Sequence, residues 1–214
     1  MNIQALIVVA LSTMFCCGAL AAPPEQHIES IVSPLALEAG KPAPDFRLTD
    51  SNGKSHTLSA LKGKYVVLEW VNFQCPFVKK HYDSGNMQKL EKTYTKKGVV
   101  WLSINSSAAG KSGNYPPGQV NALLKEKGAS PTAYLLDGDG KVGRLYGAKT
   151  TPQMFVVDPH GTIVYGGAID DRPTTDGEDV AGAKNYVQEA LDLALQGKAP
   201  AVAWTKSYGC SVKY

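Results

Sequence analysis

Cys75 is the residue whose type and position best suit it to chemistry. The apolar, β-branched run at residues 65–71 predicts a buried strand, and Pro76 is typical of the first residue of a helix, where a missing N–H costs nothing. Cys75 is therefore expected at a strand-to-helix turn, where unpaired amides and the positive end of the helix dipole favour a thiolate. Lys79 and Lys80 add positive charge one turn further on. This setting predicts a nucleophilic cysteine, and a buried structural cysteine is the alternative.

The start of the chain decides which cysteines remain in the mature protein. Residues 1–21 combine an apolar core with small residues that end at Ala21, as in a secretory signal peptide, although no Lys or Arg precedes the core. Cleavage after Ala21 would remove the first two of the four cysteines and leave Cys75 with Cys210. In an oxidising compartment such a pair is expected to form a disulfide. The sequence thus predicts a periplasmic or secreted protein that is free of the membrane after cleavage, and an uncleaved anchor is the alternative.

Composition excludes several classes of function. The 214 residues are 43% hydrophobic and 19% charged, which is ordinary for one globular domain. A net charge of +3, with lysines spread along the chain, gives no argument for binding nucleic acid. The four histidines share no metal-ligand spacing with each other or with Cys75, so we expect no metal and no cofactor.

The remaining elements must position Cys75. The predicted order is a hairpin at 46–58, the strand at 65–71, two helical pieces that meet near 83–85, a strand at 99–104, a helix at 118–127, a strand at 133–136, a hairpin at 154–165 and a helix at 180–195. This order predicts an α/β domain with a mixed β-sheet and helices on both faces. We divide the chain into a signal peptide (1–21), an extended arm (22–41), the domain (42–197) and a tail (198–214). The tail contains Trp204, Tyr208 and Cys210, so we expect it to lie on the domain.

Four stretches carry a resemblance to a known family. They are Pro42-Ala43-Pro44-Asp45-Phe46, Gly63-Lys64-Tyr65-Val66-Val67-Leu68, Cys75-Pro76, and the segment from Tyr146 to Pro152 before Phe155-Val156-Val157-Asp158. Through them, residues 42–196 resemble the thioredoxin superfamily, and within it the redoxins of the alkyl hydroperoxide reductase and thiol-specific antioxidant (peroxiredoxin-like) family. The resemblance implies a thioredoxin fold, here with an N-terminal β-hairpin extension.

Two family motifs are incomplete. The thioredoxin C-x-x-C is absent because Val78 stands where the second cysteine would be. The peroxiredoxin P-x-x-x-T-x-x-C has Leu68 and Asn72 in place of its Pro and Thr. In that family the threonine hydroxyl hydrogen-bonds the thiolate and the peroxide, and the Asn72 amide can donate in its place. A reduced peroxidase rate is the expected consequence.

The resemblance also assigns roles to other residues. Glu69, six residues before Cys75, matches the buried acid that moves a proton during disulfide exchange, and an exposed Glu at the strand end is the alternative. Pro152 after Thr151 matches the cis-proline at which the backbone meets the substrate chain. The predicted catalytic residues are Cys75, Cys210, Glu69 and Asn72, and the predicted substrate-binding residues are Pro76, Thr151 and Pro152.

The sequence leaves three functions open. The first is an exported thiol-dependent oxidoreductase with antioxidant, peroxidase-like activity, in which peroxide oxidises Cys75 to a sulfenic acid and Cys210 resolves it to a disulfide. An external thiol reductant would then be needed, and Cys210 could come from the same chain or from the second chain of a homodimer. The second is thiol-disulfide exchange with other proteins. The third is a binding module with a structural disulfide, because closing so long a loop contributes roughly 5 kcal/mol.

Overall fold

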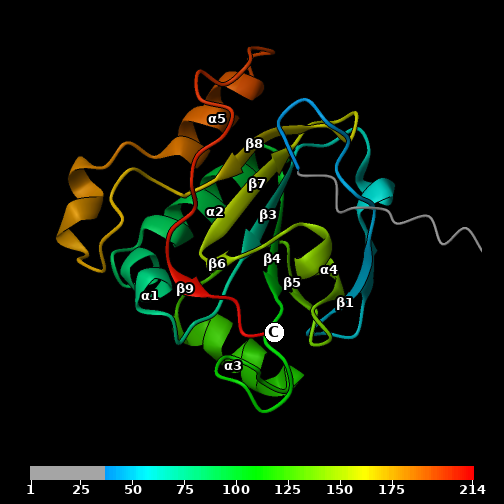
Figure 1. The fold of residues 1–214 in the computed structure, drawn as a ribbon, viewed down its shortest axis with the longest axis vertical. Coiled ribbons are helices and arrows are strands. Elements are labelled where there is room, and N and C mark those ends of the chain that lie inside the picture. The colour runs from blue at the N-terminus through cyan, green and yellow to red at the C-terminus, as the bar shows by residue number, and fades with distance from the viewer. Residues whose placement is uncertain (1–36) are drawn as a thin grey trace, which may run out of the picture. The chain divides into compact units, whose positions relative to one another are not determined.

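The computed structural model describes residues 37–214, and a seven-stranded mixed sheet lies at the centre of this part (Figure 1). The strand order is β2-β1-β5-β4-β3-β7-β8. Strands β3 (Val66–Trp70), β4 (Val100–Asn105) and β5 (Ala133–Leu136) are parallel neighbours, and β7 (Gln153–Val157) pairs with β3 in antiparallel register. The predicted signal peptide and most of the predicted arm lie outside the described residues.

Antiparallel hairpins complete both edges of the sheet. Strands β1 (Arg47–Asp50) and β2 (Ser55–Thr57) extend it beyond β5, and β8 (Ile163–Gly167) extends it beyond β7. The predicted mixed sheet with an N-terminal hairpin extension is therefore confirmed.

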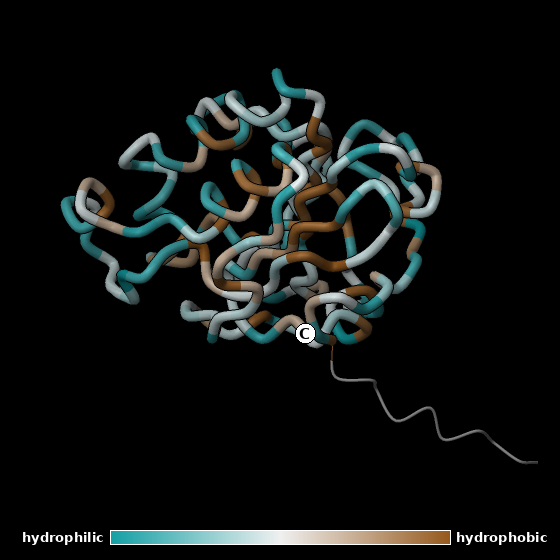
Figure 2. The backbone as a smooth tube through the Cα atoms, turned by 90° about the horizontal axis from the view of Figure 1, so that it is seen from above, coloured by the Kyte–Doolittle hydropathy of each residue, from teal (hydrophilic) through white to brown (hydrophobic). Residues whose placement is uncertain are grey.

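Helices cover both faces of the sheet, and every residue of the central strands β3 and β4 is therefore buried. One face packs against α1 (Pro76–Asp83), α2 (Asn86–Lys96), α3 (Pro117–Glu126) and α5 (Tyr186–Ala194). The other face packs against α4 (Lys141–Leu145) and the short 3₁₀ helix η1 (Leu58–Leu61). Along β3, Val67 belongs to the first core, and Leu68 and Trp70 belong to the second, as the period of a strand requires. Figure 2 shows the hydrophobic strands running between hydrophilic outer loops.

The helix predicted at 180–195 begins later than its apolar spacing indicates. Residues Glu178–Gly182 form a second 3₁₀ helix, η2, and the backbone at Ala183 is extended. Asn185 then caps α5, because its side chain accepts a hydrogen bond from the Gln188 amide at 2.8 Å. The predicted start at residue 180 was therefore wrong, although the C-terminal part of the helix is confirmed.

Some short elements were not predicted from the sequence. Besides α4, these are β6 (Thr150–Thr151) and β9 (Cys210–Ser211), which pair as a separate two-stranded sheet. A two-residue strand has no readable period, so only the folded chain reveals it.

Candidate active site

The buried Cys75 lies at the point where β3 gives way to α1. It is the N-cap of α1, it precedes Pro76 at the first helical position, and it is 3% exposed. Its amide donates to the Asn72 carbonyl at 2.9 Å, which fixes the turn that leads into the helix. Its Sγ donates a hydrogen bond to the Thr151 carbonyl oxygen at 3.0 Å. The strand-to-helix position predicted for this thiol is confirmed.

The second cysteine reaches the site through the C-terminal tail. Strand β9 pairs antiparallel with β6, and this register places Cys210 opposite Thr151 (Figure 1). Next to Cys210 lies Gly209, at φ +134°, where an added Cβ would come within 2.0 Å of the Thr151 carbonyl oxygen. The Thr151–Pro152 peptide bond is cis, as the resemblance implies. Five of the seven predicted site residues therefore meet at one place, namely Cys75, Pro76, Thr151, Pro152 and Cys210.

The two thiols differ in acidity because the hydrogen bond between them lowers the pKa of Cys75 and raises the pKa of Cys210. Burial acts to raise the pKa of Cys75, but hydrogen bonding with the Cys210 thiol, with the Thr151 side chain and with the Val78 amide outweighs it, so the pKa falls below its ordinary value. Burial and the neighbouring Cys75 raise the pKa of Cys210 to about 11. Both cysteines are free thiols in this structure. Cys75 is thus suited to act as the nucleophile, and Cys210 is suited to hold the proton.

Replacing Cys210 with alanine should raise the pKa of the Cys75 thiol. The substitution removes the strongest interaction that favours its thiolate. The check is the rate of Cys75 alkylation by iodoacetamide against pH, read by peptide mass analysis in wild type and Cys210→Ala. If the lysines of α1 set the acidity instead, the two profiles should be identical, so coincident curves would contradict this effect of Cys210.

The lysines do not act on Cys75 as predicted from the sequence. The Lys79 side chain is exposed to solvent. Lys80 is buried, and its ammonium group donates to the Arg172 carbonyl at 2.7 Å and lies 3.9 Å from Asp170. Neither lysine is among the main causes of the lowered pKa of Cys75. That part of the prediction was wrong, because helix periodicity aims Lys80 at a neighbouring loop.

Glu69 is fully buried, so the exposed alternative is excluded. Its carboxylate accepts hydrogen bonds from Trp101 Nε1 at 2.9 Å and from Ser103 Oγ at 2.8 Å. Burial raises its pKa despite these donors. Within the described residues, no hydrogen bond joins Glu69 to either cysteine, so its role in moving a proton remains a prediction.

A second buried acid, Glu91 on α2, accompanies Glu69 and was missed in the sequence. The Tyr82 hydroxyl lies 3.0 Å from Glu91 Oε1 and 3.3 Å from Glu69 Oε1. Burial, and next the charge of Glu69, raise the pKa of Glu91 to about 8. The signal was available, because Glu91 falls at helical spacing on the apolar face that carries Met87 and Tyr94.

Asn72 does not offer its amide to the thiol. Its Nδ2 donates to the Ser112 carbonyl at 3.0 Å, and its Oδ1 accepts from the Gln74 amide at 2.9 Å. The side chain also packs against Gly113, where a Cβ would clash with it at 2.3 Å. In this structure the residue instead joins the loop before α3 to the turn that carries Cys75, and its role in place of the peroxide-binding threonine remains a prediction.

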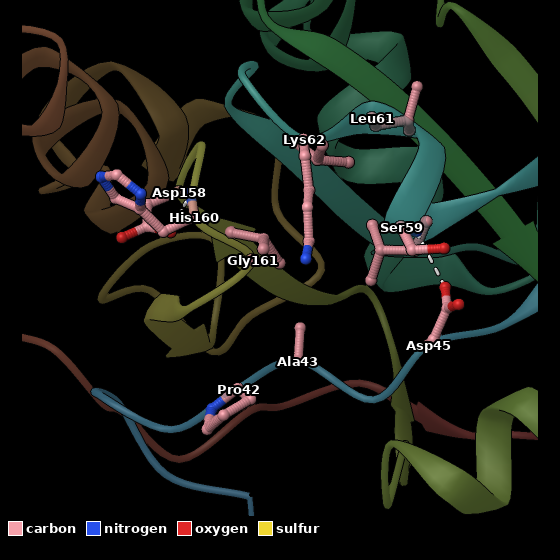
Figure 3. A pocket seen from close by; sticks show the side chains of 12 residues that line it. Pro42, Ala43, Asp45, Ser59, Leu61, Lys62, Asp158, His160 and Gly161 are labelled. Atoms are coloured by element: carbon pink, nitrogen blue, oxygen red, sulfur yellow. Dashed lines mark hydrogen bonds between the residues drawn. The ribbon is translucent and has the colours of Figure 1, made fainter.

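A pocket of about 200 Å³ lies away from this site (Figure 3). It is lined by Lys62 and Val66, before and at the start of β3, and by Asp158 after β7, whereas Cys75 follows the other end of β3. None of the predicted site residues lines it. Among residues 37–214, no cluster of three His, Cys, Asp or Glu side chains is arranged to hold a metal ion. In that same range, no helix has the length and apolarity needed to cross a membrane.

The sheet order, the thiol at the N-terminus of α1 and the adjacent cis-proline together define a thioredoxin-fold redoxin. The AhpC/TSA family model matches residues 39–166, and the chain belongs to that family. This confirms the resemblance to the redoxins of the alkyl hydroperoxide reductase and thiol-specific antioxidant family.

Relatives support the same classification. The thiol-disulfide oxidoreductase ResA of Bacillus subtilis is 30% identical over 129 residues, which are 60% of this chain and 66% of ResA. The chain thus covers slightly less than two thirds of that relative. An uncharacterized conserved protein of Geobacillus kaustophilus has a TM-score of 0.70 at 31% identity, with 82% of this chain and 92% of that chain covered. The thioredoxin domain of a Bacteroides vulgatus thiol-disulfide oxidoreductase shares the fold, with a TM-score of 0.50 at 22% identity over 68% of this chain and 97% of that chain.

Proposed function

We propose that the protein is a thiol-disulfide oxidoreductase in which Cys75 is the nucleophile and Cys210 is the resolving cysteine. The observation that carries the proposal is the register of β6 with β9, which holds Cys210 beside Cys75. The tail cysteine takes the chemical place of the second cysteine that the C-x-x-C motif lacks. The name of the Bacillus subtilis relative supports the same class of enzyme.

The exchange reaction would use the acidity difference between the two thiols. The Cys75 thiolate attacks one sulfur of a protein disulfide, which forms a mixed disulfide and releases the other sulfur as a thiolate that takes up a proton. Cys210 then loses its proton and attacks Cys75 Sγ. The Cys75–Cys210 disulfide forms, the second substrate thiol leaves, and two electrons have passed to the substrate. An external dithiol would return the enzyme to its reduced form.

A peroxidase is the second candidate, and the burial of Cys75 favours it. A thiol that is 3% exposed beneath a docked tail admits a small oxidant more readily than a protein. Attack on hydrogen peroxide would give a sulfenic acid and water, and Cys210 would displace a second water to form the same disulfide. The position of the Asn72 amide speaks against a fast reaction, because it is bound to Ser112.

Single-turnover oxidation separates the two candidates. We expect the reduced protein to reduce one insulin disulfide per molecule, and to form a Cys75–Cys210 bridge detected by peptide mapping. Oxidation of Cys75 by hydrogen peroxide, followed by stopped flow, should be slower than the reduction of insulin. The Asn72 amide is bound to Ser112 and is not available as a donor to peroxide, and loss of one donor in comparable oxyanion sites costs about 100-fold to 1,000-fold. Faster oxidation by peroxide would reverse the order of the candidates. If Cys75 is inert to both reagents, the binding-module function replaces them.

The location and the partners belong to the same proposal. An exported protein, periplasmic or secreted, agrees with a redox pair that needs an oxidising compartment or a dedicated reductant. Its partners would be a substrate protein disulfide and a thiol reductant. The intrachain register of β9 supports resolution within one chain rather than across a homodimer.

A further inference from the structure

Tyr208, a residue of the C-terminal tail, packs against the helix that begins directly after Cys75. Its ring packs on Phe77 of α1, with ring centroids 5.8 Å apart, and lies 5.8 Å from the Lys80 ammonium group. Its hydroxyl lies 3.2 Å from His81 Nε2 and donates to Asp170 Oδ1. Three residues of α1 therefore surround a tail residue two positions before Cys210.

The hydrogen bonds at Tyr208 run in one direction. Asn86 donates its amide to His81 Nδ1 at 2.9 Å, so the neutral ring carries its proton on Nε2 and donates it to the Tyr208 oxygen. Burial lowers the pKa of His81 to about 4, which keeps the ring neutral. The hydroxyl proton of Tyr208 is then free for Asp170.

The hydrogen bond from Tyr208 matters to Asp170 because the Asp170 carboxylate is buried and has few other hydrogen-bond donors. Its side chain is 1% exposed, and Oδ1 accepts from the Arg172 amide at 3.0 Å as well as from Tyr208. In the described chain, Oδ2 has no hydrogen-bond partner; Lys80 Nζ lies 3.9 Å from it and His81 Nε2 lies 4.0 Å from it. A buried charge that loses a donor is strongly disfavoured. The Tyr208 contact is thus a strong restraint on the tail.

The short distance along the chain passes this restraint on to Cys210. Only Gly209 separates the two residues, and its backbone packs directly on the Thr151 carbonyl. The segment is therefore fixed at Tyr208 by α1 and at Cys210 by β6. Cys75 is the N-cap of α1, and Tyr208 packs on the same helix. Helix α1 therefore helps to position both Cys75 and the tail segment that carries Cys210.

We propose that Tyr208 is a positioning residue that holds Cys210 within reach of Cys75, through its contacts with Asp170 and His81. This inference rests on the proposed function, since it concerns the resolving step. The phenolic oxygen takes no part in the bonds that form or break.

Ellman's reagent separates the resolving step from the first attack. The Cys75 thiolate attacks the reagent and releases one thionitrobenzoate, and Cys210 then attacks Cys75 Sγ and releases the second. In Tyr208→Phe the second release should slow by roughly 10-fold to 100-fold, as expected for one lost hydrogen bond to a buried charge. The first release should not slow, because a looser tail exposes Cys75.

Tyr186→Phe is the matched control. Tyr186 lines the same surface hollow as Asp170 and Tyr208, and in the described chain its hydroxyl forms no hydrogen bond. We expect both releases to keep their wild-type rates in this variant. Gly209→Ala provides a second test if Tyr208→Phe folds poorly, because its Cβ meets the Thr151 carbonyl and should slow the second release as well.

The outcomes are distinct. A second release at the wild-type rate in Tyr208→Phe overturns the inference, even if the thermal midpoint falls, since that result describes a purely structural tyrosine. The proposed function would still stand. If wild-type Cys75 gives no first release, under conditions in which the wild type and Tyr208→Phe are both folded, the proposed function itself is overturned.

Discussion

Replacing Cys75 with serine should abolish the reduction of insulin disulfides, with a loss of about 1,000-fold or more. The thiolate is the attacking atom, and a serine hydroxyl has neither its acidity nor its affinity for sulfur. The site offers no substitute, because Cys210 is the other cysteine at Thr151, and burial still acts to raise the pKa of its thiol in this variant. The measurement is the single-turnover release of insulin thiols, followed with wild type and Cys75→Ser at equal concentrations.

Cys210→Ser is the matched variant for this experiment. It should still attack insulin but stop at the mixed disulfide, because no thiol remains to displace the substrate from Cys75. Mass analysis should find insulin chains attached at Cys75 in this variant and at no residue in Cys75→Ser. Attachment at Cys210 in Cys75→Ser, with retained activity, would reverse the roles of the two cysteines.

Glu91→Gln should change how stability depends on pH. The pKa of Glu91 is raised from 4.5 to about 8 by burial and by the Glu69 charge, so the folded protein keeps a proton that the unfolded chain releases above about pH 4.5. The free energy of unfolding should therefore decline as pH rises from 4.5 to about 8, by several kcal/mol at most. The neutral amide that this substitution introduces mimics the protonated acid and should make that decline shallower.

Urea unfolding at pH values across that window gives the comparison. Glu126→Gln is the control, since Glu126 is exposed at the end of α3 and its removal should leave the slope unchanged. Parallel stability curves for wild type and Glu91→Gln would show that Glu91 is ionised in the folded protein.

The sequence alone determined the local setting of the nucleophile and the class of fold. A buried strand, Cys75 and Pro76 follow one another in the chain, so their geometry depends on backbone preferences that neighbouring residues decide. The alternation of strand and helix patterns likewise predicted the mixed sheet. The helix start at 180 failed because apolar spacing does not record the capping bond of Asn185.

Only the tertiary structure decided which distant residues act on Cys75. Cys75 and Cys210, far apart in the sequence, meet because β9 pairs with β6, and a two-residue pairing leaves no pattern in the sequence. Helix rotation directed Lys80 to Asp170 and away from the thiol, and loop closure turned the Asn72 amide toward Ser112. The tyrosine of the tail likewise acquires its contact with the buried aspartate only when the tail folds back across α1. Side-chain direction depends on what each face packs against, and that partner is chosen by the whole fold rather than by the neighbouring residues.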